Sequence, residues 1–242
     1  MALFLDPDLD SNLFDLSETW INRLMPYART IATKGTSGQQ VVHEALTRVG
    51  CEVFGKSGIL IYMRCGDYLV RELVEELQVQ SRELDPDEEQ RLIDDTMEVK
   101  FFLGSSKVIV TFYKKGMIKL GTIGEYQLFL RRVELWVDAD GGTSIFDVYI
   151  KNKDGVVIRG LSFSYEVDNG FAWWRRISES IWENGSIIRV QPYPTHESMR
   201  LIPAILRIIN EKSSAIDELV NQASQFLINA LEKEMTINAN NY

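Results

Sequence analysis

The sequence predicts an α+β fold, in which a mostly antiparallel sheet is flanked by helices from both ends of the chain. Near both termini, apolar residues recur at three- and four-residue steps, as they do in amphipathic helices. Between residues 98 and 193, the segments become rich in β-branched and aromatic residues and are separated by short polar turns. Because short links favour antiparallel neighbours, we expect about five to seven strands in this region.

The first part of the chain, residues 1–96, is predicted to be mainly helical. ILIYM, at 59–63, is a compact apolar run that favours a strand. Four segments have the apolar period or the capping residues of a helix: the one that begins after Asp10 and Ser11, GQQVVHEALTRVG, DYLVRELVEELQVQ and the short DPDEEQRLIDD.

Residues 97–193 are predicted to form a β-meander with an inserted helix at 170–184. Asp154-Gly155 is typical of a two-residue hairpin turn, and SIIRVQPY favours a strand at the sheet edge. FAWWRRISESIW holds three of the five tryptophans, and at 100° per residue its apolar side chains fall within about half the circumference. We therefore expect a mainly buried helix here, with a partner-binding face around Trp173 and Trp174 as the alternative.

Residues 194–236 are predicted to be helical again, and the whole chain, 1–242, is predicted to form a single α+β domain. From residue 213, apolar side chains including Ile216, Leu219 and Phe226 alternate three- and four-residue steps, as in a coiled-coil seam. Additional apolar residues widen this stripe, which favours packing in the core over an oligomer interface, and both interpretations stay open.

The composition is that of a globular protein, with 45% hydrophobic and 25% charged residues in 242. A formal net charge of −9 repels phosphate backbones, so we expect no nucleic-acid partner. The N-terminus lacks the basic and apolar regions of a signal peptide, and no apolar run is long enough to span a bilayer. Cys51 and Cys65 lack a CxxC spacing, and we expect reduced thiols in a cytoplasmic protein that makes no membrane contact.

The segment GCEVFGKS matches the phosphate-binding P-loop pattern through Gly50, Gly55, Lys56 and Ser57. A P-loop lies between a buried strand and the helix that it opens, so that backbone N–H groups face the phosphates. Here a predicted helix comes before the segment and a predicted strand comes after it. Nucleotide binding is therefore kept as the alternative function, and no bound cofactor is expected.

Glu98-Val99-Lys100 has the E-x-K spacing of metal-dependent nucleases, with Asp87 as a possible second acid. The spacing is common by chance, and Asp87 is predicted to begin a helix, so a nuclease is the weaker alternative. The neighbouring pair Arg131-Arg132 is predicted to face acidic cross-strand partners on the sheet.

No catalytic constellation or metal-ligand cluster is found, since only His43 and His196 are available for a histidine-dependent site. The apolar helices at both ends favour contacts between chains. We therefore expect a non-enzymatic interaction or assembly protein that acts through self-association or through a protein partner.

Overall fold

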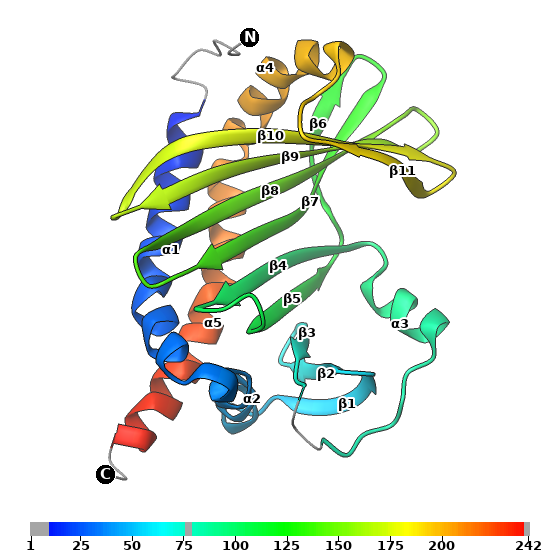
Figure 1. Cartoon of the computed structure of the whole chain (residues 1–242). Helices are drawn as coiled ribbons and strands as arrows, with labels where there is room; N and C mark the ends of the chain where they lie inside the picture. Colours follow the sequence, from blue (N-terminus) through cyan, green and yellow to red (C-terminus); the bar gives the residue numbers. More distant parts are fainter. Residues whose placement is uncertain (1–9, 76–78, 240–242) are drawn as a thin grey trace.

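The fold is given by a computed structural model that describes residues 10–75 and 79–239. These residues form five α-helices and one mixed sheet of eleven strands (Figure 1). The predicted α+β class, with helices flanking a mostly antiparallel sheet, is confirmed. The sheet is larger than the predicted five to seven strands because it begins at Glu52 instead of near residue 98.

The helices begin and end close to the predicted positions. α3 starts with Pro86, and its amino end is capped by the Asp85 side chain, which accepts from the Glu88 backbone N–H at 2.8 Å. None of the helices in the described residues is long and apolar enough to cross a membrane. The helices are α1 (Ser11–Thr33), α2 (Gly38–Arg48), α3 (Pro86–Ile93), α4 (His196–Glu211) and α5 (Ser213–Ala239).

The strands are connected mainly by tight turns. A hairpin joins β8 to β9 at Asp154-Gly155 as expected, but its link spans residues 152–156 and is longer than the predicted two residues. The strands are β1 (Glu52–Ser57), β2 (Leu60–Cys65), β3 (Tyr68–Leu73), β4 (Thr96–Leu103), β5 (Ile109–Lys115), β6 (Ile118–Ile123), β7 (Tyr126–Val137), β8 (Gly141–Lys151), β9 (Val157–Asp168), β10 (Phe171–Glu183) and β11 (Ser186–Gln191).

The strand order is β1-β2-β3-β5-β4-β7-β8-β9-β10-β11, with β6 paired to β7 beside the end of β4. Every pair of neighbours is antiparallel except β4 and β7, which run parallel. This pair joins the strands from the first half of the chain to those from the second half. β11 lies at one edge of the sheet, as its Pro-flanked sequence predicts.

The core lies between one face of the sheet and the long helices α1 and α5, which run side by side although they come from opposite ends of the chain (Figure 1). The Trp20 indole of α1 donates to Asp217 of α5 at 2.8 Å, so a polar contact supports the packing of these two helices. Ile216, at 0% exposure, is among the α5 residues of this core.

Two of the predicted helices are strands. DYLVRELVEELQVQ begins with β3, and its Glu76–Gln78 portion lies outside the described residues. The predicted helix at 170–184 is β10. In each case a glutamate occupies a core-facing position, Glu72 in β3 and Glu179 in β10, and each is fully buried by a tertiary partner. The helix prediction placed these glutamates on a solvent-exposed face, and so it missed that side chains in these segments alternate between the two faces of a sheet.

The expectation of reduced cysteines is also wrong. Cys51 and Cys65 form a disulfide whose Cα atoms are 4.4 Å apart. β1 and β2 pair with Glu52 opposite Arg64, and the next positions outward on the two strands are the two cysteines. The antiparallel register therefore brings together thiols that are 14 residues apart in sequence.

Candidate functional site on the open face and free edge of the sheet

The face of the sheet opposite α1 and α5, here called the open face, is polar and charged. Side chains alternate along each strand, so that in β4 Val99 points toward the helices while Glu98 and Lys100 point to the open face. The open face carries Tyr62, Arg71, Thr111, Tyr113, Glu98, Lys100, Phe102, Arg132, Glu134, Trp136, Asp147, Tyr149 and Ser162.

Arg132 of β7 is the centre of an ion cluster on this face. Its Nε lies 2.8 Å from the Glu98 carboxylate, and its Nη1 lies 3.5 Å from Glu134 and 3.7 Å from Asp147. Arg131 binds the other oxygen of Glu98 at 2.8 Å. Glu98, Arg132 and Asp147 are register partners on adjacent strands, which confirms the expected acidic cross-strand partners of the arginine pair.

The carboxylates of this cluster are largely removed from water. The Glu98 and Glu134 side chains are 5% and 11% exposed. Burial raises the pKa of Asp147, and the Arg132 guanidinium and the Ser162 hydroxyl oppose that rise. Because a buried carboxylate is costly unless it is paired, Arg132 offsets the cost of burying the three acidic side chains around it.

Two cations of the open face, Arg71 and Lys100, form no salt bridge with any carboxylate of the described residues. Burial lowers the pKa of Lys100, although the nearby Glu134 opposes this shift. The Lys100 ammonium lies 4.9 Å from the centroid of the Phe102 ring, which stacks on Trp136. Arg71 and Lys100 therefore lie near Glu98 and Glu134 without forming a salt bridge to them, and Arg71 is hydrogen-bonded to Tyr62.

Two hydroxyl groups lie buried beside these cations. The Thr111 Oγ1 and the Tyr113 hydroxyl have no hydrogen-bond partner among the described residues, and the two residues are 0% and 2% exposed. The Arg71 guanidinium lies over the Tyr113 ring, 5.4 Å from its centroid. Buried polar atoms are normally hydrogen-bonded, so these two orphaned groups mark an unusual position in the fold.

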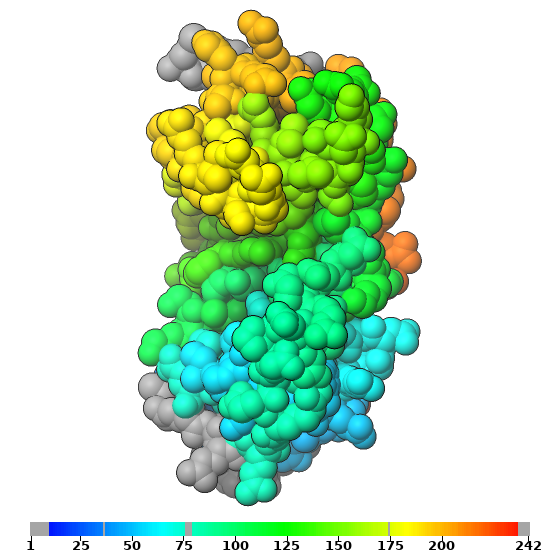
Figure 2. All heavy atoms as spheres, turned by 90° about the vertical axis from the view of Figure 1, so that its right-hand side faces the viewer, coloured from blue at the N-terminus to red at the C-terminus, as the bar shows by residue number. Residues whose placement is uncertain are grey.

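The free edge of the sheet is β11, whose large apolar residues are exposed. Ile187, Ile188 and Val190 are 51%, 59% and 71% exposed, and Tyr193, just beyond the strand, is 76% exposed. The β10–β11 pair (yellow) lies on the surface in Figure 2, on the opposite side of the central strands from α3 (teal). The opposite edge is different, because Lys56 of β1 exchanges backbone hydrogen bonds with residues 82–84.

The four residues that match the P-loop pattern have structural roles, and their arrangement differs from that of a P-loop. Gly50, at φ 96°, follows α2, and Gly55 leaves space for Leu84, because a Cβ at Gly55 would lie 2.6 Å from Leu84 Cδ2. Lys56 lies in β1 with its Nζ 3.7 Å from Glu83, and Ser57 donates to the Glu89 carboxylate at 3.0 Å. Nucleotide binding at this segment stays a prediction.

The residues predicted to contact a partner are divided between the core and the surface. Ile216 is buried and Leu219 is 9% exposed. The Phe226 ring is partly buried against Tyr68 and Phe112. Trp173 is 61% exposed.

Trp174 lies in β10, and its side chain is not among the described parts of the structure. The expectation that residues 171–182 form a mainly buried helix is therefore wrong in its secondary structure and, at Trp173, in its burial. Contact of these residues with a partner stays a prediction.

The nuclease candidates Glu98 and Lys100 lie on the open face, but Glu98 is bound by two arginines and Asp87 lies in α3. Within residues 10–75 and 79–239, no group of three His, Cys, Asp or Glu residues could hold a metal ion. Asp87 is therefore not the second acid beside Glu98, and the acids that do lie near it, Glu134 and Asp147, contact Arg132.

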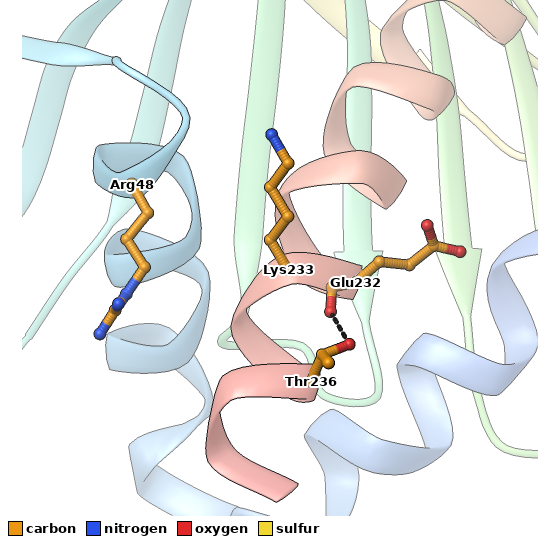
Figure 3. A pocket seen from close by; sticks show the side chains of 4 residues that line it. All are labelled: Arg48, Glu232, Lys233 and Thr236. Atoms are coloured by element: carbon orange, nitrogen blue, oxygen red, sulfur yellow. Dashed lines mark hydrogen bonds between the residues drawn. The ribbon is translucent and has the colours of Figure 1, made fainter. Parts of the chain in front are cut away.

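A pocket of about 560 Å³ lies beside α2 and the carboxyl-terminal part of α5 (Figure 3). Its described lining is Arg48, Glu232, Lys233 and Thr236. Arg48 is paired with Glu234, and Glu232 accepts from the Tyr27 hydroxyl at 2.6 Å. The lining has mixed charge and nothing in it selects a ligand.

Most residues of the open-face cluster are absent from the sequence-based candidates. Arg71, Thr111, Tyr113, Glu134 and Asp147 come from four strands, and only the register of the sheet brings them together. The one sequence feature that could have indicated this cluster is the presence of charged residues at alternate positions within a strand, as in Glu98-Val99-Lys100. Comparisons with protein-family models, with curated proteins and with solved structures found no match to this chain.

Proposed function

We propose that this protein is a non-enzymatic interaction protein that self-associates by pairing the β11 edge of one copy with the same edge of a second copy. The observation that supports this function is the exposure of Ile187, Ile188 and Val190 on β11, which pairs with β10 on one side and with no described segment on the other. An exposed apolar edge presents unpaired backbone N–H and C=O groups that a further strand can bind.

The contrast between the two sheet edges supports this role for β11. At the β1 edge, the backbone N–H of Lys56 donates to Arg82 at 3.0 Å, and the N–H of Leu84 donates to Lys56 at 2.8 Å. These contacts occupy the backbone groups that a foreign strand would need. β11 has no such cover and no internal proline, and Arg189 is its only charged residue.

A second copy is the occupant that fits these features. Two identical strands can pair antiparallel about a twofold axis, so one exposed strand per copy is enough for a closed dimer. The acidic net charge of −9 opposes close contact between most surfaces of two copies. β11 carries no acidic residue, so this repulsion is weakest where β11 strands meet.

Light scattering of the purified chain tests the proposal. We expect a dimer whose dissociation constant rises at least about tenfold in the Ile188→Lys and Val190→Lys variants, since each places an ammonium in an apolar contact. Ile59→Lys is the matched control, because Ile59 is 47% exposed at the far end of the sheet, in the β1–β2 turn. A wild-type chain that stays monomeric at high concentration, or a dimer equally sensitive to Ile59→Lys, would contradict the proposal.

A further inference from the structure

We propose that the open face contains an oxyanion-binding site, in which a carboxylate or phosphate group lies between Arg71 and Lys100 and accepts hydrogen bonds from the hydroxyls of Thr111 and Tyr113. The site involves β3, β4 and β5 and does not depend on the β11 edge. It would remain if self-association were disproved.

The sheet register sets the spacing of the site. Arg71 of β3, Thr111 of β5 and Lys100 of β4 are direct partners on three adjacent strands. Neighbouring strands are about 4.8 Å apart, so the two cations stand about 10 Å apart at their backbones with Thr111 between them. Long side chains from these two positions reach a common ligand above the middle strand, and Tyr113 lies two residues along that strand on the same face.

The nearby carboxylates are bound by other residues, so Arg71 and Lys100 can interact with a ligand. The Glu98 carboxylate is bound by both Arg131 and Arg132, and Glu134 accepts from the Trp136 indole at 2.5 Å and from Arg132. Lys100 and Arg71 have no such carboxylate partner in the described residues. Both cations are partly exposed, so solvent and ligands can reach them.

The two hydroxyls indicate a hydrogen-bonding ligand. The Thr111 Oγ1 and the Tyr113 hydroxyl are buried and have no hydrogen-bond partner in the part of the chain that the structure describes, which costs free energy in an unliganded fold. Each can donate one hydrogen bond to an oxygen atom. Two cations and two hydroxyl donors suit a ligand that is anionic and carries at least two acceptor oxygens.

A metal cation does not fit this arrangement, because the two side chains that flank Thr111 in the sheet register, Arg71 and Lys100, are both positive. A neutral ligand would bring no charge complementary to these two cations, neither of which forms a salt bridge within the described residues. A carboxylate and a phosphate group both suit this arrangement, and the binding experiment distinguishes between these two ligand classes.

Isothermal titration calorimetry of the full chain, with inorganic phosphate in one arm and acetate in the other, tests the site. Both arms are run against sodium chloride at matched ionic strength. We expect saturable binding in at least one arm, and the arm that saturates identifies the source. Thr111→Val, Tyr113→Phe and Lys100→Met are each expected to weaken it at least about tenfold, since each removes a hydrogen-bond donor or a charge.

Lys119→Met is the matched control, because Lys119 is an exposed lysine of the neighbouring strand β6. Thermal melting without anion provides a second readout. Thr111→Val and Tyr113→Phe should melt at or above the wild-type temperature, because each removes a buried hydroxyl that has no partner. Absence of saturable binding in both arms, or equal weakening by Lys119→Met, would overturn the proposal.

Discussion

Arg132 and Glu98 are direct partners on β7 and β4, and the Arg132 Nε lies 2.8 Å from the Glu98 carboxylate. β4 and β7 are the parallel pair through which the strands from the first half of the chain meet those from the second half. A buried ion pair therefore lies at the junction of the sheet. Arg131 adds to it, since its guanidinium also bonds the backbone carbonyl of Thr96, the first residue of β4, at 2.5 Å.

Replacing Arg132 by methionine should lower the free energy of unfolding by about 3 kcal/mol at about pH 7, because Glu98, Glu134 and Asp147 lose their shared cation while they remain buried. Burial raises the pKa of Asp147 and Arg132 opposes that rise, so the pKa of Asp147 is higher without Arg132. Protonation of Asp147 on acidification then relieves part of the repulsion within the cluster. The loss should therefore shrink as the pH falls toward about 4. Urea unfolding across this range measures it.

Arg207→Met is the control for this change, because Arg207 is an exposed residue of α4. It should alter the free energy of unfolding by less than about 0.5 kcal/mol. A loss in Arg132→Met that is the same at every pH would show that packing, and not the uncompensated acids, accounts for the cost.

His43 of α2 and Glu72 of β3 form a second buried pair, with Nδ1 and Oε2 2.7 Å apart. His43→Leu should destabilise the fold by about 3 kcal/mol, since it leaves a carboxylate at 2% exposure without its cation. The double variant His43→Leu, Glu72→Leu should recover most of this loss. A double variant as unstable as the single one would contradict the ion-pair explanation.

The pH dependence of this pair has a defined sign. The hydrogen bond that His43 donates to the Glu72 carboxylate raises the pKa of His43, and burial raises the pKa of Glu72. Both shifts mean that the folded state binds more protons than the unfolded state. The stabilisation by the pair is therefore largest at low pH and is lost as the pH rises through the raised pKa of His43, above about 6.5. The measurement is the difference in the free energy of unfolding between the wild type and the double variant as a function of pH.

These buried glutamates explain which strands could be predicted from sequence. Regions such as β8 and β9 were predicted as strands because polar turns bound them and apolar side chains alternate along them, even though Arg159 of β9 lies on the helix-facing side. In β3 and β10 the core-facing positions include Glu72 and Glu179. Their partners, His43 and Arg159, are 29 and 20 residues away, so the local pattern carries no sign of the pairing.

The open-face cluster shows the same limit. Glu98 and Lys100 were candidates because they are two residues apart, but their interpretation as a metal site depended on Asp87, which lies in α3. Arg132 forms a salt bridge with the Glu98 carboxylate only because β4 and β7 pair in parallel. That pairing joins segments about 30 residues apart, which neither hydrophobic period nor turn signals specify.

Glu179 of β10 binds the amino end of α4, where its carboxylate accepts from the Thr195 backbone N–H at 2.6 Å, from the Ser198 hydroxyl and from Arg159. Burial raises the pKa of Glu179, but these hydrogen bonds outweigh it and the net pKa is lowered. A lowered pKa gives stability that is present above about pH 4.5, the unfolded value, and is lost as the pH falls through the folded value.

Glu179→Gln should therefore lower the free energy of unfolding by about 2 kcal/mol at neutral pH, and the difference from wild type should disappear below about pH 4. Glu183→Gln, at the exposed end of the same strand, is the matched control and should change little. The measurement is urea unfolding at several pH values. A deficit in Glu179→Gln that persists in acid would show that the amide fails to fit, independently of charge.

The contribution of α5 to the core gives the largest predicted effect. Ile216, Val220, Leu227 and Leu231 are each 0% exposed. Burial of such a side chain stabilises a fold by about 1.5–3 kcal/mol, so these four contribute about 6–12 kcal/mol, which is comparable with the whole stability of a typical domain. Since α5 packs against both α1 and α2, it joins helices from the far end of the chain.

A chain that ends at residue 212, and so lacks the last 30 residues, should therefore lose its cooperative unfolding transition and its near-ultraviolet circular dichroism. A chain that ends at residue 239 keeps all of α5 and is the matched control. If the shorter chain melts in the same transition as the full one, then α1 and the sheet form a stable unit without α5, and the prediction of a single domain over residues 1–242 is wrong.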